Sequence, residues 1–280
     1  MSDFKPALSF VLPDQTTLLA ELDGLAVRSD AVARGLAAIK SGFFTHPDGR
    51  TDELGDVSLF HSQLALLAHL AHIAPQGLSI EIGFGMGSST AIILGVRALK
   101  GPDFQHLAFD PYGLPDNRGT IVQNYLETEF GDAFKRIYKR SEIGLAQLFD
   151  NAGAGSVGLI FIDGSHTFEN VIVDFFWADA LCCVGGYIIF DDADYPAIET
   201  AINYIEKNRP NYQIHRSAAV NTTILFKTAD YEIPWYAFAP FEVAERKDWD
   251  KKTSLSLSTA CVLWPRTSGL NSCHHKVFCR

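Results

Sequence analysis

Three aspartates end two apolar runs in the second half of the chain. Asp163 closes VGLIFID, and the pair Asp191–Asp192 closes GYIIFDD. If these runs are neighbouring parallel strands, the three carboxylates lie side by side at one sheet edge. At a separation of about 4 Å and an effective dielectric constant near 20, each like-charge pair costs on the order of 4 kcal/mol. The group must therefore take up protons or bind a cation.

A cation at this position would be a hard one, because the predicted ligands are carboxylate oxygens, with no cysteine or second histidine among them. Mg²⁺ suits an incomplete set of protein oxygens whose remaining positions go to water or substrate, with Mn²⁺ and Ca²⁺ as alternatives. Asp163 and Asp192 could instead cap loops or helices, with Asp191 facing solvent. Both interpretations remain open on the residues alone.

A glycine-rich stretch, LSIEIGFGMGSST, follows an earlier apolar run at residues 78–90. Gly83, Gly85 and Gly87 let the backbone turn sharply and approach a ligand, and the start of the following helix offers free N–H groups. The stretch therefore predicts a nucleotide-like ligand. The dinucleotide fingerprint G-x-G-x-x-G would need its third glycine at position 88, where this chain has Ser88.

The order Glu81, Gly83, Gly85, Gly87 resembles motif I of class I S-adenosylmethionine-dependent methyltransferases. The resemblance implies that this loop holds the methionine and ribose part of S-adenosylmethionine. It also implies that a carboxylate at the end of the second strand accepts hydrogen bonds from the ribose hydroxyls. The cofactor-binding residues expected on this basis are Glu81, Gly83, Gly85, Gly87, Ser89, Asp110 and Ser141.

Residues 160–194 resemble the D-G-x-H…GG…DD pattern of the metal-dependent O-methyltransferases that include the macrolide and aminocoumarin sugar enzymes. The resemblance covers roughly residues 57–228. It implies that Asp163, Asp191 and Asp192 hold Mg²⁺ and that His166 is the general base. Some relatives use an aspartate two residues after the first ligand as the base, but this chain has Ser165 there.

Short β-branched or aromatic runs alternate with longer amphipathic stretches from residue 78 onward, which is typical of strands joined by crossover helices. The predicted fold is α/β, a Rossmann-like, doubly wound, seven-stranded mixed sheet. The last two strands are too close in sequence for a crossover helix, so we expect them to pair antiparallel. The predicted strands are 78–82, 106–110, 135–139, 157–163, 186–192, 212–216 and 222–227, with helices over 88–100, 119–131, 166–183 and 197–209.

Two further helices, over 16–40 and 58–75, precede the predicted sheet and are joined by the turn-rich segment 43–56. The expected organisation is an N-terminal helical cover (1–56), an S-adenosylmethionine-binding domain (57–228) and a C-terminal extension (229–280). The extension begins rich in aromatic residues and ends rich in Ser, Thr and Cys. Its residues Cys273, His274, His275 and Cys279 do not have the usual spacing of zinc ligands.

The composition of the chain limits the kinds of partner that we expect it to bind. The 280 residues are 47% hydrophobic and carry a formal net charge of −10, so we expect a folded chain that binds neither nucleic acid nor an anionic membrane. The N-terminal apolar runs are broken by Pro6 and Pro13 and lack a preceding basic region, which predicts a cytoplasmic location. Five irregularly spaced cysteines predict reduced thiols.

The leading hypothesis is an S-adenosylmethionine-dependent, Mg²⁺-dependent O-methyltransferase acting on a hydroxylated small molecule such as a secondary-metabolite sugar. Homo-oligomerisation is left open. The alternatives are a metal-independent methyltransferase, a nicotinamide-dependent oxidoreductase on a related sheet, and a non-catalytic binding module. The missing third glycine at position 88 argues against the nicotinamide enzyme.

Overall fold

The computed structural model of the chain describes residues 8–55, 59–111, 119–217 and 220–245. The chain divides into two compact units, Met1–Ala244 and Glu245–Arg280. The fold is that of the first unit. The predicted C-terminal extension, including its Cys and His residues, lies outside the described residues from position 246 onward.

A seven-stranded mixed sheet forms the centre of this unit, in the order β5-β4-β3-β6-β7-β9-β8. The first five strands in this order are parallel, whereas β9 runs antiparallel to both of its neighbours. The predicted fold class and the antiparallel last pair are thus confirmed. The strands are β3 (Gly77–Ile82), β4 (Phe104–Phe109), β5 (Phe134–Ile137), β6 (Val157–Ile162), β7 (Cys182–Phe190), β8 (Tyr212–Ser217) and β9 (Thr222–Lys227).

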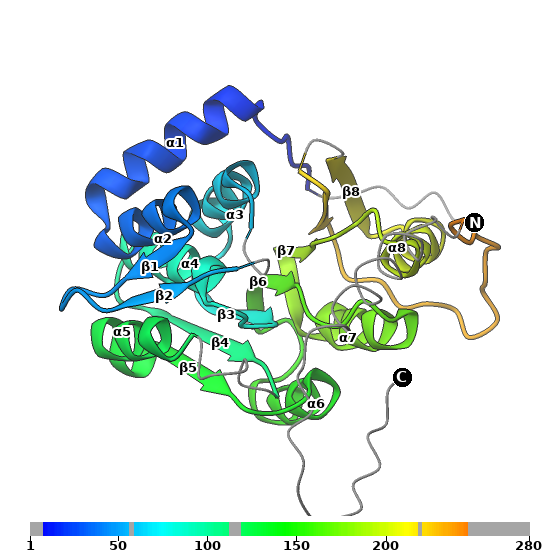
Figure 1. Ribbon diagram of the computed structural model, residues 1–280. Coiled ribbons are helices and arrows are strands. Elements are labelled where there is room, and N and C mark those ends of the chain that lie inside the picture. The colour runs from blue at the N-terminus through cyan, green and yellow to red at the C-terminus, as the bar shows by residue number, and fades with distance from the viewer. Residues whose placement is uncertain (1–7, 56–58, 112–118, 218–219, 246–280) are drawn as a thin grey trace, which may run out of the picture. The chain divides into compact units, whose positions relative to one another are not determined.

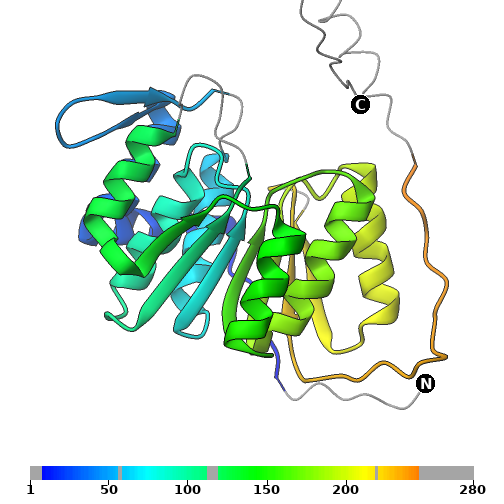
Figure 2. The same cartoon turned by 90° about the horizontal axis from the view of Figure 1, so that it is seen from below.

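Helices cover both faces of the sheet (Figures 1 and 2). One face is packed by α6 (Ser141–Ala152), α7 (Phe168–Leu181) and α8 (Pro196–Asn208). The other face is packed by α3 (His61–Ile73), α4 (Ser88–Ala98) and α5 (Thr120–Phe130), which continues into a short 3-10 turn, η2 (Gly131–Ala133). Strands β6 and β9 are buried along their whole length, as expected for apolar strands with both faces covered.

The N-terminal cover differs from its prediction as one long helix over 16–40. It consists of α1 (Gln15–Arg28) and α2 (Asp30–Ser41), because Ser29 adopts an extended conformation between them. The Ser29 hydroxyl accepts a hydrogen bond from the backbone N–H of Val32, which begins the second helix. A small glycine in α4 lets α2 approach closely. A Cβ atom on Gly95 would lie 2.6 Å from Ser29 Oγ and 2.8 Å from Val32 Cγ2.

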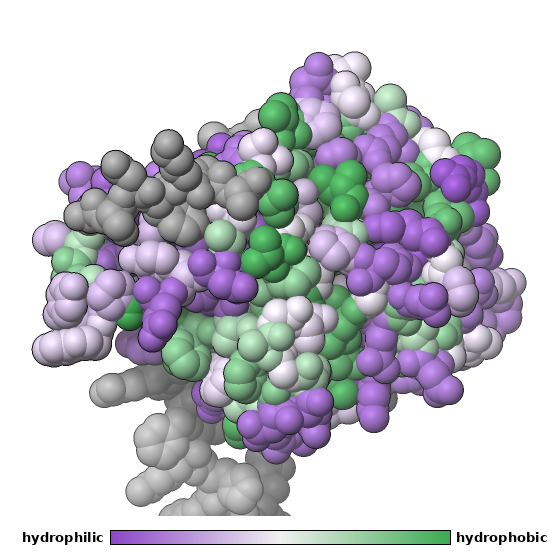
Figure 3. Space-filling model, turned by 180° about the vertical axis from the view of Figure 1, so that it is seen from behind, coloured by the Kyte–Doolittle hydropathy of each residue, from purple (hydrophilic) through white to green (hydrophobic). Residues whose placement is uncertain are grey.

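Two elements were not predicted. The segment expected to be a turn-rich connection contains a hairpin of β1 (Phe43–Thr45) and β2 (Thr51–Glu53). Helix α6 follows β5, in a stretch for which no helix was predicted. Among the described residues no helix is both long and apolar enough to cross a bilayer. The face shown in Figure 3 mixes hydrophilic residues with hydrophobic patches.

Candidate functional site

The carboxyl ends of β3, β4, β6 and β7 lie at one edge of the sheet, where a cavity of about 520 Å³ opens. Gly83, Asp110, Ser141 and Asp163 line it, and they come from four different strand-to-helix connections. A volume of this size is within the range of small-molecule sites. The fold therefore brings three residues predicted to bind the cofactor and one predicted metal ligand to the same cavity.

The glycine loop between β3 and α4 requires its glycines. Gly83, Gly85 and Gly87 all have positive φ, at +93°, +49° and +67°. A Cβ atom on Gly83 would clash with the backbone carbonyl oxygen of Asp163, and one on Gly87 would lie 2.6 Å from the Phe84 ring. The loop thus passes directly against the β6–α7 connection, which no residue with a side chain would permit.

Glu81 lies beneath this loop rather than in the cavity lining. Its carboxylate is fully buried and accepts hydrogen bonds from the hydroxyls of Ser89 and Thr90 in the first turn of α4. His106 Nε2 lies 3.4 Å from the same carboxylate. Glu81 and Ser89, both predicted to bind the cofactor, therefore contact each other, and neither is among the described residues that line the cavity.

Asp110 lies at the cavity edge and has protein partners of its own. Its Oδ2 accepts hydrogen bonds from Arg136 at 3.1 Å and from the backbone N–H of Phe84 at 3.3 Å. The Arg136 guanidinium also lies 4.4 Å from the centre of the Phe84 ring. The glycine loop, the end of β4 and the end of β5 are thereby joined around one carboxylate.

Ser141, at the start of α6, also lines the cavity. Its hydroxyl is hydrogen-bonded to Asp174 of α7, a side chain that is only 1% exposed. Burial raises the pKa of Asp174 to about 6, although the Ser141 hydrogen bond acts in the opposite direction. Asp174 was not singled out from the sequence, because a lone Asp within an apolar helix pattern carries no recognisable signal.

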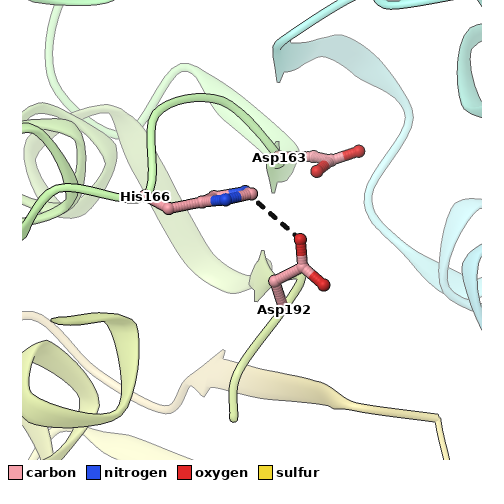
Figure 4. A group of neighbouring side chains, drawn as sticks. All are labelled: Asp163, His166 and Asp192. Carbon is pink, nitrogen blue, oxygen red and sulfur yellow. Dashed lines mark ion pairs between the residues drawn. The ribbon is translucent and has the colours of Figure 1, made fainter. Parts of the chain in front are cut away.

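Asp163, His166 and Asp192 form a compact group, with one potential ligand atom from each within 4.8 Å of the others. Figure 4 shows the His166 imidazole and the Asp192 carboxylate pointing toward each other, with Asp163 beside them at the end of β6. His166 Nε2 lies 3.2 Å from Asp192 Oδ2. Oxygen and imidazole nitrogen atoms in this arrangement are a donor set that can hold a divalent cation.

The acidic side chains in and beside this group have pKa values above their usual range. Burial, followed by the charges of Asp191, Glu81 and Asp192, raises the pKa of Asp163 well above its usual range. Burial and the neighbouring Asp192 raise the pKa of Asp191 to about 7. The pKa of Asp192 is also raised, mainly by burial, with His166 opposing the shift. A bound cation would reverse this penalty on the ionised carboxylates.

Asp191, the third predicted metal ligand, lies outside this group of three and has partners of its own. Its Oδ1 accepts hydrogen bonds from Gln63 Nε2 at 2.6 Å and from Thr222 Oγ1 at 3.2 Å. The residue is 5% exposed, so the alternative that it faces solvent is wrong. Gln63 was missed by sequence reasoning. Its signal is a glutamine at the third position of a helix, which is typical of a capping box.

A turn with unusual backbone geometry carries Asp192. Asp192 and Asn221 both have positive φ, at +49° and +50°. Asn221 Nδ2 donates to Asp194 Oδ1 at 2.5 Å and to Asp192 Oδ1 at 3.4 Å, and its Oδ1 accepts from the Asp194 N–H. Asn221 therefore holds the segment after β7 from the neighbouring strand connection, which sequence reasoning did not foresee.

His69 of α3 lies apart from the acidic group. It is 9% exposed, and its Nδ1 lies 2.6 Å from Glu21 Oε2 of α1. This contact fastens α1 to α3.

Comparisons with known proteins agree with the fold and the site region. A family model described as a methyltransferase domain matches residues 80–193, which include every predicted site residue. An uncharacterised protein of Acanthamoeba polyphaga mimivirus is 27% identical over 154 residues, which cover 52% of this chain and 67% of that protein.

Two solved structures share the fold. The S-adenosylhomocysteine-bound Podospora anserina methyltransferase superposes with a TM-score of 0.53 at 16% identity, over 79% of this chain and 100% of that one. A TDP-rhamnose 3'-O-methyltransferase of calicheamicin biosynthesis superposes with a TM-score of 0.50 at 14% identity, over 80% of this chain and 98% of that one.

Proposed function

Because the chain carries a class I, S-adenosylmethionine-dependent methyltransferase domain, we propose that it methylates a hydroxyl group of a small molecule with the help of Mg²⁺. The observation that carries the proposal is the convergence of Asp163, His166 and Asp192, of which Asp163 also lines the cavity together with Gly83 and Asp110. One site then has room for a cofactor and groups for a cation and a proton.

The cofactor would occupy the cavity beside the glycine loop. Gly83 leaves space for close approach of the ligand, and Asp110 offers a carboxylate to the ribose hydroxyls. Ser141 lines the same cavity, and we assign it to the adenine ring. The absence of side chains at the three loop glycines is needed for this contact, as their positive φ angles require.

The cation would be held by Asp163 and Asp192, with Asp191 completing the acidic set. Burial first, and the neighbouring carboxylates second, raise the pKa values of all three groups, and a bound cation would relieve both penalties on the ionised forms. When bound, Mg²⁺ would supply Lewis-acid stabilisation of the deprotonated acceptor oxygen. Carboxylate oxygens and the shallow, open position leave places for substrate oxygens.

His166 would take the proton of the acceptor hydroxyl. The acceptor oxygen then forms a bond to the methyl carbon as the carbon–sulfur bond breaks, leaving S-adenosylhomocysteine. Asp192, whose Oδ2 lies 3.2 Å from His166 Nε2, would balance the positive charge that the imidazole acquires. The rings of His166 and Tyr195 have centroids 4.8 Å apart, so Tyr195 gives this side of the site an aromatic wall.

A hydroxylated sugar of a secondary metabolite is the acceptor class that we favour. The TDP-rhamnose 3'-O-methyltransferase with the same fold supports this choice, and an aromatic wall such as Tyr195 suits the apolar face of a sugar ring. A metal-independent methyltransferase is the second candidate, because Asp191 and Asp192 already have protein hydrogen-bond partners. A nicotinamide enzyme gains no support from the family match.

Calorimetric titration of S-adenosylhomocysteine, with excess Mg²⁺ and then with EDTA, tests the proposal. We expect one binding site per chain that the Gly85→Arg variant loses. The rate of methylation of hydroxylated acceptors is measured through the S-adenosylhomocysteine that is released. This rate should require the cation, and it should fall at least about a hundredfold in Asp163→Asn. Activity that survives EDTA would favour the metal-independent candidate, and absence of cofactor binding would refute both.

A further inference from the structure

Gln63 connects the start of α3 to the acidic site. It is the third residue of α3 and is 7% exposed. Its Oε1 accepts a hydrogen bond from the backbone N–H of Phe60 at 2.7 Å, and its Nε2 donates to Asp191 Oδ1 at 2.6 Å. Both ends of the buried amide therefore have a partner, one in the first turn of a helix and one at the end of β7.

These contacts fix the carboxylate of Asp191 in one orientation. Thr222 Oγ1 lies 3.2 Å from the same oxygen, but its single proton is shared with the Val220 carbonyl oxygen at 2.8 Å, so Gln63 is the more constant donor to Oδ1. The amide of Gln63 cannot rotate without losing its bond to Phe60, which distinguishes it from a freely rotating hydroxyl. Hydrogen-bond partners of this kind set the direction and the charge of a metal-binding carboxylate.

We propose that Gln63 is a positioning residue that holds Asp191 for cation binding and thereby ties the cation site to the start of α3. The inference rests on the proposed function, in which Asp191 belongs to the acidic set that holds the cation. Gln63 lies outside the matched methyltransferase-domain residues 80–193. Helix α3 would then contribute to the chemistry of the site as well as to the core.

The first test compares Mg²⁺ affinity in the wild type, Gln63→Met and the control Gln76→Met. Methionine keeps the length of the side chain but neither accepts from Phe60 nor donates to Asp191. Gln76, which donates to the backbone oxygen of Arg97 at 3.3 Å, is an exposed glutamine away from the site. We expect Gln63→Met to weaken Mg²⁺ binding about tenfold or more, within the range measured for partners of metal ligands, with no change in the control.

S-adenosylhomocysteine affinity, measured on the same samples, separates positioning from folding. Gln63→Met should bind this ligand within about twofold of the wild type, because the glycine loop does not contact Gln63. In turnover, the variant should require more Mg²⁺ for half-maximal activity and recover most of kcat at saturating Mg²⁺. Equal Mg²⁺ affinity in Gln63→Met and the wild type would overturn the inference and leave the proposed function intact.

Hydrogen exchange of the wild type provides a test that needs no variant. If α3 and the cation site are linked, Mg²⁺ must slow amide exchange at residues 60–66, because coupling between two sites is reciprocal. Exchange in α5, whose residues lie away from Asp191, serves as the reference. Unchanged exchange at residues 60–66 under saturating Mg²⁺ contradicts the inference. A wild type that binds no divalent cation refutes the metal in the proposed function, and the inference with it.

Discussion

At the scale of single residues, Gly83 is the position where the loop is least tolerant of change. Its φ of +93° is strained for any other residue, and a Cβ atom would clash with the carbonyl oxygen of Asp163. We expect Gly83→Ala to weaken S-adenosylhomocysteine binding about tenfold or more, because a left-handed conformation alone costs about 1–2 kcal/mol. Isothermal titration would measure the effect.

The control for this substitution is Gly153→Ala. Gly153 has a similar φ of +80°, but a Cβ atom there would meet no atom within 4 Å. The control should lose some stability and keep its affinity for S-adenosylhomocysteine. Equal affinity in both variants would show that the loop can move away from Asp163 without consequence for the ligand.

Asp174 predicts a dependence of stability on pH. Because burial raises its pKa in the folded state to about 6, from an unfolded value near 4, its contribution to stability is complete below about pH 4. That contribution is lost as the pH rises past about 6, and the difference amounts to about 3 kcal/mol. Urea unfolding of the wild type at pH 5 and pH 8 would measure about half of this loss from Asp174, on the order of 1.4 kcal/mol.

The Asp174→Asn variant should remove the part of this difference that comes from Asp174, and Asp163 and Asp191, whose pKa values are also raised, account for what remains. Asparagine can still accept a hydrogen bond from Ser141, and it carries no charge that burial would penalise. If the variant and the wild type showed the same change between pH 5 and pH 8, another group would have to cause it.

At the scale of elements, the contact between α2 and α4 depends on Gly95. A Cβ atom at this position would lie 2.6 Å from Ser29 Oγ and 3.0 Å from the backbone nitrogen of Val32, so α2 would have to shift. Although alanine favours a helix by about 1 kcal/mol over glycine, overpacking costs about 1–3 kcal/mol. We expect Gly95→Ala to lower the free energy of unfolding by about 1 kcal/mol in chemical denaturation.

Gly24→Ala in α1 is the matched comparison. No atom lies within 4 Å of a Cβ built on Gly24, so only the helix preference remains and the free energy of unfolding should rise by about 1 kcal/mol. Opposite signs for the two variants would demonstrate that packing sets the effect at Gly95. Matching signs would mean that α2 moves aside at no cost.

The elements that could be predicted from sequence are those whose signals are local. Runs such as VGLIFID define strands through hydrophobicity, and the left-handed glycines define the loop through their spacing. The division of the N-terminal cover at Ser29 depends on a single cap, which a long apolar pattern hides. The contact of Gln63 with Asp191 spans 128 positions and has no local signal, so only the folded chain reveals it.

The same limit applies to the candidate site. The residue types at positions 163, 166 and 192 and their order along two strand ends were readable from the sequence, and they lie together. Which carboxylate turns toward His166 was not readable. Asn221, just before β9, and Thr222, the first residue of β9, hydrogen-bond to Asp192 and Asp191 and so influence which carboxylate does this.

At the scale of the whole molecule, cation binding should appear as stability. A ligand that binds only the folded state raises its stability by RT ln(1 + [L]/Kd), so Mg²⁺ at 100 times its Kd should add about 2.7 kcal/mol and raise Tm. The increase should disappear in Asp163→Asn and persist in Asp150→Asn, which removes an exposed carboxylate of α6. A similar increase in Tm for all three proteins would point to non-specific binding by the acidic surface.

The place of β9 between β7 and β8 has a consequence for how the protein is made. Synthesis delivers β8 before β9, so β8 has no partner and the apolar edge of β7 stays bare until residues 222–227 have left the ribosome. An unpaired edge of this kind recruits other chains. Among the strands of the described residues, the last to be translated is thus an interior strand, and nascent chains halted before it would depend on chaperones to stay out of aggregates.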